Sequence, residues 1–128
     1  MTPSTAIFNA VYIGCKKTST SIYDYLPKER VPYPFIYIDG NNSKLMASSD
    51  ILGSVEQRIH VYGKRVQRLD LDKLHEAIKA NIDFYNQELN GYYLTTHSIQ
   101  DRTIQDNTDV EPLLHIVLDV TISFTRKD

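Results

Sequence analysis

Residues 114–124 decide the fold, and they read LHIVLDVTISF. Large apolar side chains stand at every second position, and mostly polar ones fill the positions between them. A period of two residues is typical of a β-strand with one face against a core. We therefore expect this strand to point five side chains into the core, namely Leu114, Ile116, Leu118, Val120 and Ile122.

Five further elements are predicted by hydrophobic spacing. Helical spacing predicts helices over residues 4–17 and 69–89, and alternating or β-branched runs predict strands over 35–38, 55–62 and 92–105. Strands that neighbour each other in sequence favour antiparallel hairpins. We expect one α+β domain, residues 1–128, with the order helix, strand, strand, helix, strand, strand. Its antiparallel four-stranded sheet would be packed on one face by two helices.

The opposite face of this sheet is expected to be mostly polar. It would carry side chains from the second and fourth strands, namely Arg58, His60, Asp119, Thr121 and Ser123. Such a face is either exposed to solvent or buried against another subunit.

Two stretches are predicted to lie outside regular structure. Residues 23–34 contain Pro27, Pro32 and Pro34, a spacing that favours an extended connector. Residues 41–53 are mostly small and polar, which predicts a long loop that is mobile in the free subunit and ordered by a partner. Lys44 and Met46 in this loop are candidate contact residues.

Composition limits the class of protein. A chain of 128 residues with a net charge of −2 is a single domain without the overall field of a nucleic-acid binder. Its one cysteine, Cys15, excludes an intramolecular disulfide and is expected to be a buried or half-buried thiol on a helix. Residues 1–14 lack the pattern of a secretion signal, and no stretch is apolar enough for a membrane span, so we expect a soluble, intracellular protein.

No catalytic, cofactor or metal site is predicted. The four histidines lack the close spacing of a metal motif, and no nucleophile elbow, phosphate loop or dinucleotide fingerprint occurs. Asp101 and Asp106 lie five residues apart on a predicted strand, which favours opposite faces over a carboxylate pair. We therefore expect that the protein is not an enzyme and binds no cofactor.

Two charged clusters are candidates for contact with partners. The basic cluster comprises Arg58, Lys64, Arg65 and Arg68, and the acidic cluster comprises Asp101, Asp106, Asp109 and Glu111. The basic cluster could contact DNA phosphates, but a solvated loop or an interface with an acidic neighbour is favoured. In a head-to-tail assembly the basic edge of one subunit would then face the acidic hairpin of the next.

The pattern of the whole chain resembles the tail terminator (tail completion, or head-tail joining) proteins of long-tailed phages with non-contractile tails. The resemblance is carried by residues 22–27, the stretch 33–38, the polar stretch after Asn41, residues 55–62, the long helix after Arg68, and the closing strand 115–122.

This resemblance implies a virion structural protein at the head–tail junction, assembled in the host cytoplasm. The family forms a ring, usually of six copies, that caps the tail tube, stops tube polymerisation and docks to the head connector. DNA would pass through the lumen without sequence-specific binding. The alternatives are another phage neck or head-completion adaptor, or a small enzyme whose site the sequence hides.

Overall fold

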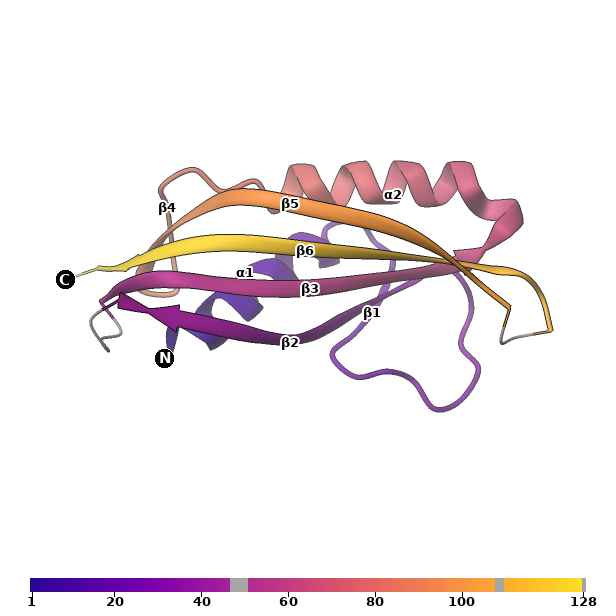
Figure 1. Ribbon diagram of the computed structural model, residues 1–128, viewed down its shortest axis with the longest axis horizontal. Coiled ribbons are helices and arrows are strands. Elements are labelled where there is room, and N and C mark those ends of the chain that lie inside the picture. Colours follow the sequence, from indigo (N-terminus) through magenta and orange to yellow (C-terminus); the bar gives the residue numbers. More distant parts are fainter. Residues whose placement is uncertain (47–50, 108–109, 128) are drawn as a thin grey trace.

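Figure 1 shows the computed structural model of the chain, which describes residues 1–46, 51–107 and 110–127. The helices are α1 (Pro3–Lys16) and α2 (Arg68–Asn81), and the 3-10 turn η2 (Arg65–Gln67) leads into α2. The strands are β1 (Ser21–Tyr23), β2 (Phe35–Leu45), β3 (Leu52–Lys64), β4 (Gln87–Leu89), β5 (Tyr92–Asp106) and β6 (Leu113–Arg126). The four long strands run along the longest axis of the molecule, and the sheet is visibly curved.

The sheet has six strands in the order β1-β2-β3-β6-β5-β4, and it is mixed because β1 pairs with β2 in parallel. The prediction of an antiparallel four-stranded sheet is therefore wrong. The two additional strands, β1 and β4, have three residues each and lie at the two edges. Three residues are too few for a period of two to emerge, so the sequence pattern does not reveal them.

Strand β6 lies at the centre, between β3 and β5, and both of its pairings are antiparallel. All five side chains predicted to face the core do so, and each is at most 5% exposed. They share one apolar core with buried residues of α1 and α2, which places both helices on the same face of the sheet. Within the residues that the structure describes, no helix is long and apolar enough to cross a lipid bilayer.

Helix α2 ends at Asn81, so the predicted continuation to residue 89 is wrong. The chain turns toward β5 because the Thr96 hydroxyl donates to the Ile82 carbonyl at 2.5 Å and accepts from the Phe84 amide at 3.1 Å. Ile82 and Phe84 enter the core, whereas Tyr85, which the helical spacing placed on the apolar stripe, is 89% exposed. Apolar residues of a turn can therefore continue a helical spacing by chance.

The predicted loop over residues 41–53 is also wrong where the structure describes it. Strand β2 continues to Leu45 and β3 begins at Leu52, with Leu45 paired to Gly53. Residues 47–50 lie outside the described residues. Most side chains of β2 beyond Ile38 are exposed. This part of the hairpin therefore lacks the alternation of buried and exposed residues by which a strand is predicted from sequence.

The two helices meet at Gly14 of α1. A Cβ atom on Gly14 would lie 2.9 Å from Ile82 Cγ2 and 3.0 Å from the carbonyl oxygen of Asn81. Asn81 also donates a side-chain hydrogen bond to the Gly14 carbonyl at 3.1 Å. The adjacent Cys15 is fully buried, as predicted, and burial raises the pKa of its thiol to about 12.

We expect Gly14→Ala to destabilise the protein, although alanine is normally the better helix former. Overpacking against the buried Ile82 should lower the free energy of unfolding by about 1–3 kcal/mol, as measured by urea denaturation. Gly40→Ala is the matched control, because nothing lies within 4 Å of a Cβ at Gly40. A stabilised Gly14→Ala protein would show that the two helices do not approach this closely.

Candidate functional site

The sheet face that no helix covers, which we call the open face, carries mostly polar side chains. Alternation along β2, β3 and β6 places one set of residues there, namely Tyr37, Asp39, Glu56, Arg58, His60, Tyr62, His115, Val117, Asp119, Thr121 and Ser123. Most are half-buried or exposed, in contrast to their neighbours on the helix side. The five residues that the sequence assigned to this face all lie on it.

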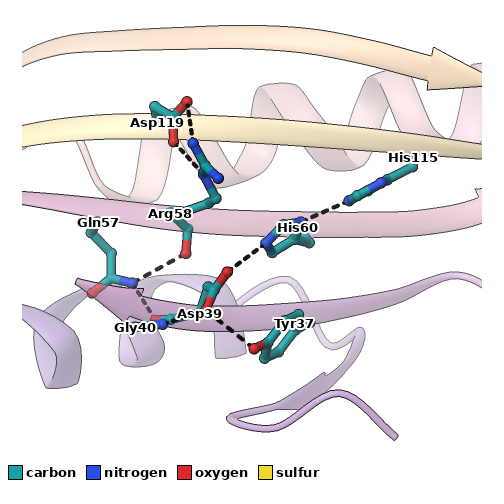
Figure 2. Close-up of polar contacts among 8 residues, drawn as sticks. All are labelled: Tyr37, Asp39, Gly40, Gln57, Arg58, His60, His115 and Asp119. Atoms are coloured by element: carbon teal, nitrogen blue, oxygen red, sulfur yellow. Dashed lines mark hydrogen bonds and ion pairs between the residues drawn. The ribbon is translucent and has the colours of Figure 1, made fainter.

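Four of these side chains form a continuous row across three strands (Figure 2). The Tyr37 hydroxyl donates to Asp39 Oδ1 at 3.2 Å, and Asp39 Oδ2 lies 2.9 Å from His60 Nε2. On its other side, His60 Nδ1 lies 2.7 Å from His115 Nε2. The Gly40 amide also donates to Asp39 Oδ1 at 2.7 Å. Both ring nitrogens of His60 are therefore engaged within the row.

Ring stacking holds the same row in place. Tyr62 stacks on His115 with ring centroids 4.1 Å apart, and His60 stacks on Tyr37 at 5.1 Å. Because the rings cover one another, the side chain of His60 is only 12% exposed although no helix lies over it.

The positions of the protons in the row follow from its contacts. A carboxylate only accepts, so His60 Nε2 carries a proton and donates to Asp39. Between His60 Nδ1 and His115 Nε2 one nitrogen must donate and the other accept, so this contact holds a single proton. A second proton there would place two N–H groups face to face at 2.7 Å and break the contact.

The pKa values agree with this arrangement. Burial disfavours the cation of His115 and, with the charges of His60 and Arg102, lowers its pKa from 6.5 to about 4 against the opposing effect of Asp106. Burial alone would raise the pKa of Asp39, but hydrogen bonds from His60, the Gly40 amide and Tyr37 outweigh it and hold that pKa below 3.8. Asp39 is thus ionised and His115 neutral near pH 7.

The buried side-chain amide of Gln57 holds the backbone beside the row. Gln57 is 1% exposed, and its Nε2 donates to the carbonyls of Asp39 at 2.7 Å and Arg58 at 3.1 Å. Its Oε1 accepts from Asn41 at 3.0 Å, beside the irregularity in the β2–β3 register between Ile38 and Asn41. Sequence reasoning missed Gln57, although a polar residue at an apolar position of the alternation was the available signal.

The structure separates the members of the predicted charged interface. Arg58 lies in the middle of the open face and pairs with Asp119 at 2.8 Å, far along β3 from Lys64. At the end of the sheet where β3 leads into η2, Lys64 contacts Glu111 at 3.5 Å, and Arg65 donates to Gln105 at 2.6 Å. Basic and acidic members of the two clusters therefore meet within one chain.

The remaining members lie elsewhere. Arg68 begins α2, and Asp101 lies on the helix side of β5, where its Oδ2 is 3.2 Å from His75 Nε2. Asp106 ends β5, and Asp109 lies outside the described residues. Lys44, near the end of β2, and Met46, directly after β2, are both exposed.

The open face offers a polar depression beside the row. No group of three or more histidine, cysteine or acidic side chains that could hold a metal ion occurs in the described ranges. Beside the row, a polar depression of about 350 Å³ is lined by residues that include Asp39, Glu56, Arg58 and Asp119. Because both nitrogens of His60 are bonded within the row, this histidine is not poised to take a proton from a substrate.

The sequence matches no known family model and no curated protein. Among solved structures, the chain resembles one chain of the virion of the native gene transfer agent (GTA) particle. The similarity covers 97% of this chain and 95% of that chain, with a TM-score of 0.62 and 12% sequence identity. At this identity, the likeness shows a shared fold over the full length of both chains.

The His115 pKa makes stability depend on pH. Lowering the pH from about 7 to about 4.5 should destabilise the protein, because the unfolded chain protonates His115 below pH 6.5 and the folded chain does so only near pH 4. At full burial a shift of this size is worth about 3 kcal/mol, and partial exposure reduces the expected loss to about 1–2 kcal/mol. Urea unfolding at the two pH values measures this loss in the free energy of unfolding.

His115→Gln, which has no titrating group, is the control and should lose less stability over the same interval. Asp39 does not confound the comparison, since its stabilising effect is lost only as pH falls below 3.8. An equal loss in both proteins would contradict the proton arrangement of the row.

Proposed function

We propose that this chain is a structural protein of a phage-type virion, and more specifically that it forms a ring that caps the tail tube. The observation that supports a virion role is the likeness to a GTA virion chain, because it spans nearly the full length of both chains. The resemblance of the sequence to tail terminators supports the narrower role. In that role the ring stops tube polymerisation and offers the docking surface for the head connector at the head–tail junction.

The shape of the subunit supports a ring. A ring with head-to-tail contacts needs two unlike surfaces on each subunit, and the elongated sheet offers two different ends (Figure 1). At one end β2 ends and β3 begins, and at the other lie η2, the start of α2, the end of β5 and the start of β6. The partners would be further copies of the chain, the tube protein and the connector, with DNA in the lumen.

A structural role is also supported against a catalytic one. The row on the open face binds its own histidines and carboxylate together, which makes the sheet rigid and leaves His60 without a nitrogen for a substrate. A second candidate is another neck or head-completion adaptor, since the same fold likeness would support it equally.

Growth of tail tubes in the presence of the purified chain tests the proposal. Tube protein from the same virus, polymerising in vitro, should give tubes that stop lengthening when the chain is added, as measured by negative-stain microscopy. An unrelated protein of similar size is the control. Unchanged tube growth together with tight binding to the head connector would favour the adaptor, and binding to neither would overturn the virion role at this junction.

A further inference from the structure

Two stretches of strand at opposite sides of the sheet lack an outer neighbour among the residues that the structure describes. Strand β1 pairs with β2 only over residues 35–37, which leaves residues 39–45 of β2 without an outer strand. Strand β4 pairs with β5 only over residues 92–94, and the Thr96 amide then donates to the Phe84 carbonyl. Residues 98–105 of β5 have no outer strand either. We call residues 39–45 the β2 edge and residues 98–105 the β5 edge.

The side chains of both edges are mostly exposed to solvent. In the β5 edge only Ile99 is partly buried. The side chains of Asp101, Thr103 and Gln105 lie on the helix side and are exposed, so α2 leaves most of this stretch uncovered. In the β2 edge, residues 42–45 are all exposed. A strand edge of this kind presents backbone donors and acceptors with which a strand of another chain can pair.

We propose that the β5 edge of one copy of this chain pairs with the β2 edge of a second copy, which joins the two sheets into one. Strand direction favours this partner. The pairings that connect β2 to β5 through β3 and β6 are all antiparallel, so β2 and β5 run in opposite directions. A second copy in the same orientation beside the first therefore presents its β2 antiparallel to β5, which is the more stable pairing. This contact also covers both edges of every copy, whereas pairing of two like edges leaves the other edge bare.

The helix-side residues of the two edges match when the edges overlap along their whole length. In this register Leu45 of the second copy, which is 37% exposed in the free chain, lies beside the partly buried Ile99. Two residues further along, Ser43 of the second copy lies beside Asp101, and its hydroxyl can donate to that carboxylate. An apolar pair and a hydrogen-bonded pair at cross-strand positions both stabilise a sheet.

The open-face residues match in the same register. Lys44 of the second copy lies beside Gln100, and Asn42 lies beside Arg102. Asp39 of the second copy is then a diagonal neighbour of Arg102, within reach of this long side chain. No like charges stand directly opposite each other in these pairs, so the chemistry of both faces supports a second copy as the partner.

The displacement between the copies fits a closed sheet. Within one copy, the pairings across the sheet place Lys44 level with Thr95 of β5. In the proposed contact Lys44 lies beside Gln100 of its neighbour, and the stretch from Thr95 to Gln100 extends about 17 Å along the strand. The step from one β2 to the next crosses β3, β6 and β5, which amounts to about 19 Å at the usual strand spacing.

These two lengths tilt the strands by about 40°, within the range of about 35–45° that closed barrels adopt. A head-to-tail contact of this geometry can therefore close into a ring. The inference rests on the proposed ring, for which it names the contact.

A disulfide across the contact tests the pairing. Lys44→Cys with Gln100→Cys places thiols on cross-strand neighbours of different copies, and the Cα separation of about 4.5–5.5 Å in an antiparallel pair suits a disulfide. Within one chain β3 and β6 separate the two positions by about 14 Å, which no disulfide spans. The native Cys15 is buried and does not interfere.

Mild oxidation of the double variant, free at high concentration and bound to tail tubes, should give covalent multimers on a non-reducing gel. Glu56→Cys with Gln100→Cys is the matched control, because Glu56 is exposed on the same face but lies in β3, one strand behind the β2 edge. It should give at least tenfold less product. Absence of multimers from the first pair in both conditions would overturn the inference, and so would equal cross-linking of the control. Dimers of Lys44→Cys or Gln100→Cys alone would show that like edges meet, which also overturns it.

Amide hydrogen exchange tests the same contact in the unaltered chain. Backbone pairing should slow exchange at least tenfold in residues 41–45 and 98–105 when the chain assembles, and should leave residues 24–30, outside both edges, unchanged. A multimer in which either edge stays unprotected would overturn the inference.

The proposed function fails separately. Wild-type protein that does not stop tube growth would overturn the capping role even if the two edges cross-link. Conversely, a protein that stops tube growth while the edges do not cross-link on tubes would retain the capping role and overturn only this contact.

Discussion

The antiparallel pairing of β6 with β3 and β5 is the constraint on which the rest of the structure depends. It fixes the register of three long strands, and thereby decides which side chains enter the core under α1 and α2. A slip by one residue would exchange the two faces of a strand, bringing Asp119 inside and Leu118 out. The same register sets His60 of β3 close to His115 of β6 and links both to Asp39.

Sequence patterns predicted the parts of this fold in which buried and solvent-exposed residues alternate regularly. Strand β6 and α1 were predicted nearly to their ends, because their apolar residues keep a strict spacing. The three-residue edge strands are too short to show an alternation of buried and exposed positions. The part of β2 beyond Ile38 shows no alternation either, because most of its side chains are exposed. The end of α2 was missed because Thr96, distant in sequence, supplies the hydrogen bonds that turn the chain.

The candidate site was harder to predict, since it depends on register and not on composition. Asp39 lies just beyond the strand predicted over residues 35–38, whereas in the structure it links Tyr37 to His60 in a row that spans three strands. The charged clusters were predicted to contact partners, and within the chain Lys64 contacts Glu111, which sequence spacing cannot reveal. Several side chains of the open face thus contact one another, as Asp39 does with His60 and Arg58 with Asp119.

The central claim is that this rigid, elongated sheet is a unit of a ring at the end of a tail tube. A cryo-electron microscopy reconstruction of tail tubes with the bound chain tests it most directly. Our account predicts a closed ring of copies of the chain at one end of the tube. Density for the chain along the tube wall, in the capsid, or as single copies without mutual contact would contradict it.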